Sequence, residues 1–99
     1  MLWRHGDVLI AQTKSIPTDV MRSASTILAR GEITGHSHRV EDPSSAQMWI
    51  ARNGEIYLKI LATTRIIHEE HHPITLEPGT YRVWQQREYT PERVRPVYD

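Results

Sequence analysis

Residues 47–61 read QMWIARNGEIYLKIL, and this stretch decides the fold. Asn53-Gly54 stands near its centre, and this dipeptide suits the positive-φ positions of a tight hairpin turn. Every second residue from Ile56 to Ile60 is aliphatic, which is the period of a strand with one face on a core. The stretch therefore predicts an antiparallel hairpin with arms at 47–51 and 55–61.

Other short apolar or β-branched runs are bounded by turn residues, which is typical of strands. They lie at residues 7–12, 26–34, 65–67, 74–76 and 81–89. Pro17 breaks the first run, and we expect one helical turn near residues 19–23. Because no segment of a dozen residues has helical periodicity, we predict an all-β fold, a small antiparallel β-sandwich or barrel of about seven short strands.

A chain of 99 residues is long enough for one modest core. We expect a single β domain over residues 1–89. Residues 90–99 hold two prolines among charged side chains, so we expect an irregular C-terminal tail there.

The chain has 12 Lys and Arg residues against 12 Asp and Glu residues. This balance creates no general attraction to nucleic acid or to an anionic membrane, and a net charge near zero favours self-association. We therefore expect a homo-oligomer, with nucleic acid an improbable partner.

Cysteine is missing, which excludes disulfides, thiolate metal sites and cysteine nucleophiles. The N-terminal residues lack an apolar segment of signal-peptide length, and no run approaches the roughly 18 residues of a membrane span. We expect a soluble, cytoplasmic protein without membrane contact.

Six histidines occur, and five of them form two clusters: His36 and His38, then His68, His71 and His72. Neutral imidazole is a common ligand of transition metals. On a strand His36 and His38 leave the same face, close enough to bind one ion, and Glu41 or Asp42 offers an oxygen ligand. The alternative is a pair of rim histidines hydrogen-bonded to the backbone.

The second cluster, HEEHH at 68–72, matches the letters of the zincin motif His-Glu-x-x-His. That motif needs a helix, but Ile66-Ile67 precedes it in a β-like run and Pro73 disfavours helical geometry at His72. In an extended segment His68 and His72 share a face, whereas in a turn His68 and His71 converge. The alternative is a solvated loop in which the two glutamates balance the histidines.

Together the clusters predict a divalent transition metal, zinc, nickel, manganese or iron, bound by His36 and His38 with His68 and His71 or His72. The ion is either structural, at a sheet or subunit junction, or the centre of a small catalytic site. No serine, threonine or lysine is singled out as a nucleophile, so the sequence favours binding over enzymatic activity and identifies no small-molecule ligand.

The C-terminal third is basic and aromatic, with Arg82, Arg87, Arg93, Arg95, Trp84, Tyr89 and Tyr98. Such a surface could stack bases and contact phosphates, but the neutral overall charge favours a polar strand face followed by an interfacial tail. The alternative function is therefore a metal-free self-assembly or protein-interaction module.

The sequence contains three motifs: GEITGHSH at 31–38, HEEH at 68–71 followed by Pro73-Ile74, and PGTY at 78–81 leading into QREYTP at 86–91. In these motifs, and in the opening GDVL at 6–9, the chain resembles a family of small uncharacterised proteins of bacteria and their phages. The resemblance covers most of the chain and implies no activity.

A looser similarity, of architecture alone, is to the cupins, β-barrels whose metal site begins with a His-x-His pair and a glutamate. His36, His38 and Glu41 resemble that beginning. Glu41 follows the histidine pair more closely than the glutamate does in cupins. The cupin motif also has a histidine shortly after Pro-x-Gly, and Arg82 occupies that position here.

Overall fold

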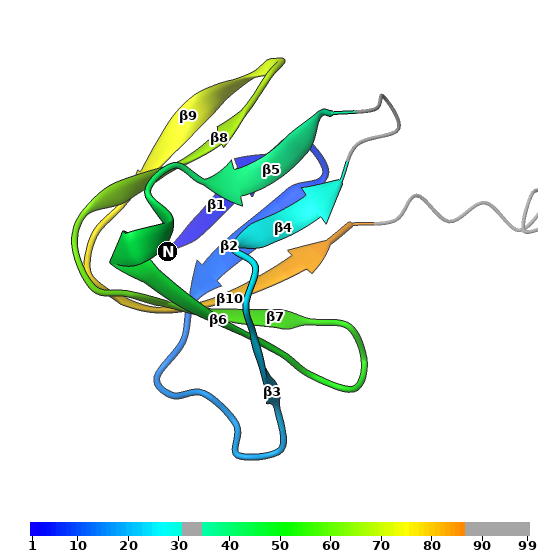
Figure 1. Cartoon of the computed structure of the whole chain (residues 1–99), viewed down its shortest axis with the longest axis vertical. Coiled ribbons are helices and arrows are strands. Elements are labelled where there is room, and N and C mark those ends of the chain that lie inside the picture. Colours follow the sequence, from blue (N-terminus) through cyan, green and yellow to red (C-terminus); the bar gives the residue numbers. More distant parts are fainter. Residues whose placement is uncertain (31–34, 87–99) are drawn as a thin grey trace, which may run out of the picture.

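Two antiparallel sheets, one of six strands and one of four, make up the computed structural model, which describes residues 1–30 and 35–86 (Figure 1). The six-stranded sheet has the order β1 (Leu2–His5), β2 (Val8–Gln12), β10 (Gly79–Gln85), β7 (Ile56–Ile60), β6 (Ala46–Ile50) and β3 (Met21–Ser23). The four-stranded sheet has the order β4 (Ile27–Arg30), β5 (Ser37–Val40), β8 (Thr64–His68) and β9 (His71–Leu76). A short 3-10 turn, η1 (Pro43–Ser45), leads from β5 into β6.

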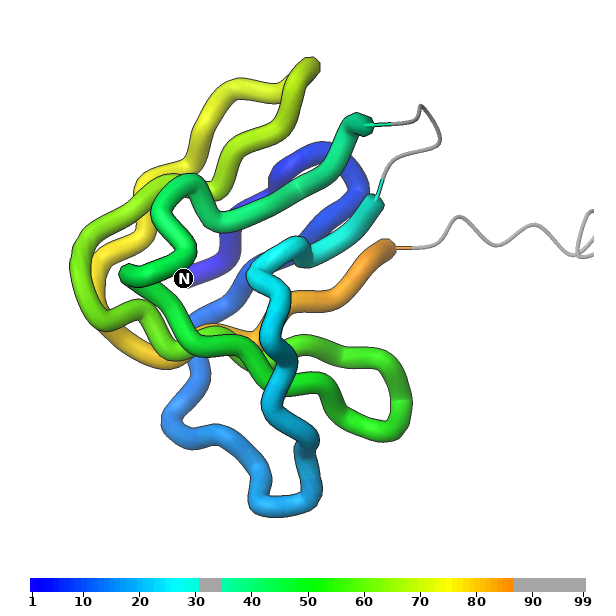
Figure 2. Tube along the Cα trace, viewed as in Figure 1, coloured from blue at the N-terminus to red at the C-terminus, as the bar shows by residue number. Residues whose placement is uncertain are grey.

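The core lies between the sheets because alternate residues of strands in both of them face inward. Its buried apolar members are Val8, Ile10, Leu28, Val40, Ala46, Met48, Leu58, Ile60, Ile66, Leu76, Tyr81 and Val83. Tyr81 is 1% exposed, and its hydroxyl donates a hydrogen bond of 2.7 Å to the carbonyl of Glu77. The architecture is therefore a sandwich, and the chain trace passes repeatedly from one sheet to the other (Figure 2).

The predicted hairpin is confirmed, with β6 and β7 paired across a turn in which Gly54 has φ 90°. The all-β fold is confirmed too, although the described residues hold ten strands rather than about seven. The additional strands, β1, β3 and β5, are short and mix polar with apolar residues, so they lack a clear pattern. The predicted tail and parts of the runs at 26–34 and 81–89 lie outside the described residues.

The helical turn expected near residues 19–23 is wrong. Met21–Ser23 form the edge strand β3, whose residues pair with β6 from Ile50 to Met48. Long-range pairing with an existing strand therefore decides the conformation of this segment, which its own sequence leaves open. Within the described residues no helix is long and apolar enough to cross a membrane.

A bulge in β9 determines which histidine faces inward. Ile66 pairs with Ile74 and His68 pairs with His71, so three residue steps on β9 lie opposite two on β8. One extra residue is thus inserted in β9, and His71 lies on the same face as Ile74. Pro73, which has no N–H to donate, falls inside this irregular stretch of an edge strand, where proline is tolerated.

Substitution of Leu58 by alanine tests the core. Leu58 is fully buried, and its loss should lower the free energy of unfolding by about 2–5 kcal/mol, measured by urea denaturation. Lys59→Ala on the same strand is the control, because this exposed side chain should change stability by no more than about 0.5 kcal/mol. Equal effects of the two substitutions would contradict the assignment of faces on β7.

Candidate metal centre

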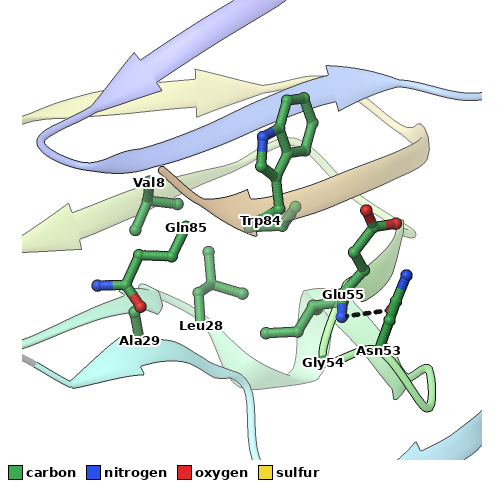
Figure 3. A pocket seen from close by; sticks show the side chains of 10 residues that line it. Val8, Leu28, Ala29, Asn53, Gly54, Glu55, Trp84 and Gln85 are labelled. Atoms are coloured by element: carbon green, nitrogen blue, oxygen red, sulfur yellow. Dashed lines mark hydrogen bonds between the residues drawn. The ribbon is translucent and has the colours of Figure 1, made fainter. Parts of the chain in front are cut away.

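A hollow near the β6–β7 turn is one candidate site, and side chains from both sheets line it (Figure 3). Its charged residue Glu55 lies 3.3 Å from the guanidinium of Arg82, and Arg82 lies over the ring of Trp84 at 4.3 Å. These groups therefore neutralise and cover one another, and the hollow presents no arrangement of reactive side chains.

The second candidate is a cluster of four histidines, His5, His38, His68 and His71, which we call the histidine cluster. His38 lies on β5, His68 ends β8, His71 begins β9 and His5 ends β1. Arg39 pairs with Ile67 on the neighbouring strand, and continuing this register places His38 beside His68. The ring centroids of His38 and His68 are accordingly 4.4 Å apart.

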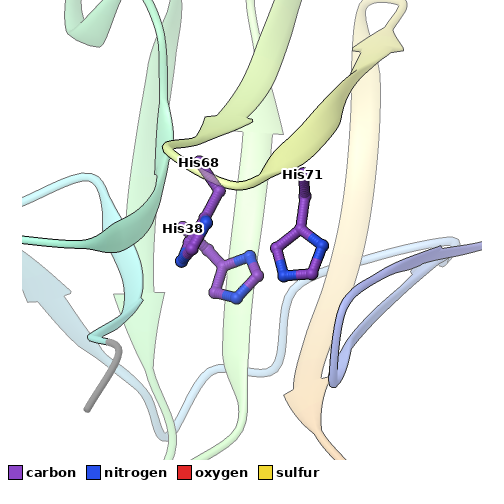
Figure 4. A group of neighbouring side chains, drawn as sticks. All are labelled: His38, His68 and His71. Carbon is purple, nitrogen blue, oxygen red and sulfur yellow. The ribbon is translucent and has the colours of Figure 1, made fainter. Parts of the chain in front are cut away.

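Three of these rings converge on one point (Figure 4). The imidazoles of His38, His68 and His71, the His38 triad, each offer a nitrogen, and these nitrogens all lie within 4.8 Å of one another. Tetrahedral zinc with Zn–N bonds of about 2.0–2.1 Å requires nitrogens roughly 3.3 Å apart. Small rotations of the rings would thus bring the three nitrogens onto one ion.

The triad is closed on one side and open on the other. His38 is buried, His68 is half-buried and His71 is exposed, so an ion has access from solvent along His71. On the inner side the rings contact the β1–β2 turn at Gly6, where a Cβ would lie 2.8 Å from Nε2 of His71 and 3.1 Å from Cε1 of His38. Glycine, which also adopts φ 65° here, lets this turn approach the rings.

Burial controls the protonation of the two inner rings. Burial, reinforced by the neighbouring His68 and His5, lowers the pKa of His38 to about 4, although Asp7 opposes the shift. Burial likewise lowers the pKa of His5. Both rings are therefore neutral at pH 7, which is the form that binds metals.

His68 is held in a particular tautomer by the turn. Its Nδ1 accepts a hydrogen bond of 3.0 Å from the backbone N–H of Glu70. The proton of the neutral ring therefore lies on Nε2. A neutral ring that binds an ion through Nε2 would carry its proton on Nδ1 instead, at the expense of the contact with Glu70.

A second group, His36, His68 and Glu69, lies beside the triad and shares His68 with it. The carboxylate of Glu69 already accepts the Ser37 N–H at 3.1 Å and lies 3.0 Å from the guanidinium of Arg39. These contacts, the Ser37 bond first, hold the pKa of Glu69 below its usual value. Since its oxygens are occupied, this group is the weaker candidate.

The predicted ligands are thus divided in space. His38, His68 and His71 meet, His36 belongs to the neighbouring group with its Nδ1 3.4 Å from Glu70, and the exposed His72 belongs to neither group. The alternative in which HEEHH forms a turn is confirmed, because β8 and β9 join there.

The two predicted oxygen ligands are engaged elsewhere. Glu41 accepts a hydrogen bond of 2.7 Å from Arg65, and Asp42 accepts hydrogen bonds from Ser44 and Ser45 at the start of η1. Although Glu41 and Asp42 follow His38 closely in the sequence, neither carboxylate belongs to the His38 triad.

His5 is not among the ligands predicted from the sequence. Its alternation with Trp3 shows that both residues share a face of β1, but nothing in the sequence places β1 next to β9. That proximity depends on how the two sheets face each other, so no local pattern reports it.

The fold and the site define the class of protein: it is an all-β sandwich with a histidine-lined site between its sheets. The chain belongs to the family described as "Domain of unknown function (DUF8820)", whose model matches residues 4–86. No curated protein and no solved structure matches the chain. Membership of an uncharacterised family agrees with the expectation from sequence, whereas an origin in phages and bacteria stays a prediction.

The low pKa of His38 predicts a pH dependence of stability in metal-free protein. Between about pH 6.5 and 4 the unfolded chain binds a proton at His38 that the folded protein does not. The free energy of unfolding should therefore fall as the pH falls through this window, by at most about 1.4 kcal/mol per pH unit for this group.

Urea denaturation in the presence of EDTA measures this slope. His38→Gln should make it shallower, while His72→Gln, which changes an exposed histidine outside the cluster, should keep the wild-type slope. A wild-type stability that is constant across the window would contradict the prediction.

Proposed function

We propose that this domain binds a divalent transition metal ion through the imidazoles of His38, His68 and His71. The observation that carries the proposal is the convergence of three ring nitrogens, from three strands, within 4.8 Å of one another. Since the chain has no cysteine, imidazole is the strongest transition-metal ligand it offers.

The ligand chemistry favours zinc, nickel, iron or manganese. Imidazole suits zinc, nickel and iron, and a carboxylate in the set would also suit manganese. Three protein ligands with an exposed side are typical of a site that keeps a position open for water or a further ligand, whereas structural zinc sites have four protein ligands. In this proposal the predicted ligands His36 and His72 do not bind the ion directly.

An ion at the triad would link β5 to the β8–β9 hairpin. The link would lie at the end of the four-stranded sheet that is next to β1. Because the site exists only in the folded chain, binding should raise stability by mass action, by about 2.7 kcal/mol at a free metal concentration of about 100 times Kd.

Metal content and thermal stability test the proposal. Untagged protein should contain stoichiometric metal by inductively coupled plasma mass spectrometry, and its Tm should rise when metal is added. His38→Ala and His71→Ala should abolish both effects because each removes one of three ligands. His72→Ala is the matched control and should keep the metal. A wild-type protein without metal, whose Tm responds to none of zinc, nickel, copper, manganese and iron, would refute the proposal.

A second candidate function, self-association into a homo-oligomer, is favoured by an exposed apolar pair at a sheet edge. Met21 on β3 and Ile50 on β6 are Cα partners and are 77% and 41% exposed. β3 is the edge strand of its sheet, so its outer backbone groups are available to pair with another strand. On this candidate the edge pairs with a second copy of the chain.

Charged substitutions at this edge test the second candidate. Met21→Lys with Ile50→Lys should shift the mass measured by light scattering from oligomer to monomer, since buried charges without partners would oppose the interface. Leu2→Lys, at the opposite edge of the same sheet, is the control and should leave the oligomer intact. A monomeric wild-type protein, or an oligomer that tolerates the double substitution, would exclude this interface.

A further inference from the structure

The charges of the chain are divided unevenly between the two sheets. The strands of the six-stranded sheet contain four basic residues, Arg4, Arg22, Lys59 and Arg82, and no acidic residue. Acidic residues instead directly follow β5, β8 and β9 of the other sheet, at Glu41, Asp42, Glu69, Glu70 and Glu77. The chain is therefore neutral as a whole, but its larger sheet is basic.

The four basic side chains share the outward face of the six-stranded sheet. Successive side chains of a strand leave opposite faces. Arg82 lies between two buried residues of β10, and Lys59 lies between two buried residues of β7. Arg4 comes directly before a buried residue of β1, and Arg22 is the Cα partner of Trp49, which follows a buried residue of β6. All four therefore point away from the four-stranded sheet.

Aromatic side chains lie among these cations. A row across the sheet consists of Arg22, Trp49, Tyr57 and Arg82, each the Cα partner of the next. Trp84 lies on the same face, two residues after Arg82. The three aromatic rings are half-buried, so part of each ring is in contact with solvent. The row crosses three strand spacings of about 4.8 Å each, and this span of about 14 Å matches about four stacked nucleotides at roughly 3.4 Å each.

Two of the arginines are stacked on tryptophans. Cζ of Arg22 lies 5.3 Å from the centre of the Trp49 ring, and Cζ of Arg82 lies 4.3 Å from the centre of the Trp84 ring. A guanidinium held over a ring has a second planar face, and nucleic-acid bases stack on guanidinium planes as well as on aromatic rings. The two pairs therefore enlarge the planar surface on this face.

Most of the positive charge on this face is not neutralised locally. Within the described residues, Arg82 is the one of the four cations that forms an ion pair, with Glu55 at 3.3 Å. Arg4 donates a hydrogen bond of 2.6 Å to the uncharged side chain of Gln86. The local charge of a surface, rather than the neutral charge of the whole chain, decides what the surface attracts.

We propose that the outward face of the six-stranded sheet binds single-stranded nucleic acid. Bases stack on Trp49, Tyr57 and Trp84, and phosphates contact the cations beside these rings. Every base has a planar face, so this mode of binding has little sequence preference. An acidic protein segment would match the charge but would leave the aromatic surface unused. The proposal does not depend on metal binding, because the face lies on the side of the sheet away from the core.

Fluorescence anisotropy of a fluorescein-labelled oligothymidylate of about 12 nucleotides tests the proposal. Untagged protein should bind this probe at low salt. The logarithm of the association constant should fall with the logarithm of the salt concentration with a slope of about −2 to −3, as expected for three or four phosphate contacts at about −0.7 each. The measurement is made in EDTA, so that a metal ion has no part in it. Absence of binding at about 50 mM salt would overturn the proposal.

Substitutions of Tyr57 test the stacking. Tyr57→Leu removes the ring and should weaken binding by roughly 5- to 140-fold, the effect of losing one stacked base. Tyr57→Phe is the control, because it keeps the ring and should bind as the wild type does. A folded Tyr57→Leu protein with wild-type affinity would overturn the proposal. Should this variant fail to fold, unlabelled oligothymidylate should quench the tryptophan fluorescence of the wild type, and unchanged emission on binding would overturn stacking.

Substitutions of arginine test the assignment of the face. Arg22→Gln should weaken binding and make the salt slope shallower by about 0.7, because one phosphate contact is lost. Arg65→Gln is the control, since it removes the same charge from the outward face of the other sheet, where Arg65 pairs with Glu41. Equal effects of the two substitutions would overturn the assignment.

A competitor without bases separates nucleic acid from other polyanions. Poly-L-glutamate at equal charge should displace the labelled probe much less effectively than unlabelled oligothymidylate does. If the two competitors are equally effective, the face recognises charge alone, and the proposal of nucleic-acid binding is overturned.

Discussion

The pairing of His68 with His71 across the β8–β9 turn is the constraint on which the site depends. A regular ladder continuing from the Ile66–Ile74 pair would place His72, rather than His71, opposite His68. The extra residue in β9 changes the register by one position, so His71 lies on the inner face beside His68. A single local irregularity thus decides which imidazole joins the cluster and which one remains in solvent.

The histidine cluster places imidazole rings among the buried side chains of the sandwich. In a domain of 99 residues the core is small, so burying His5 and His38 replaces apolar contacts that would stabilise the fold. Each buried ring also requires partners for its nitrogens, and Nε2 of His5 is buried without one. Polar groups that reduce stability in this way are often retained for function, which is why the cluster, rather than the hollow near Trp84, is the favoured site.

The parts of the fold that depend on local chemistry were predictable. Asn53-Gly54 and the alternation after it specify the β6–β7 hairpin, and Pro73 after HEEHH excludes a zincin helix. The strands β1, β3 and β5 were missed as separate elements because their extended form depends on partners distant in sequence. His5 was missed for the same reason, since 33 residues separate it from His38 and their contact exists only after the two sheets have associated.

Competition between the two histidine groups shows how the surrounding charges select one site. Both groups use His68, and a neutral imidazole offers one nitrogen to an ion, so the groups cannot both be filled independently. Arg39 and the Ser37 N–H bind the carboxylate of Glu69, which makes its oxygens poor ligands. The Asp7 carboxylate has one oxygen held by the amide of Gln85, and its other oxygen lies 3.6 Å from Nε2 of His38. The placement of a single arginine therefore favours an ion at the His38 triad over one at the neighbouring group.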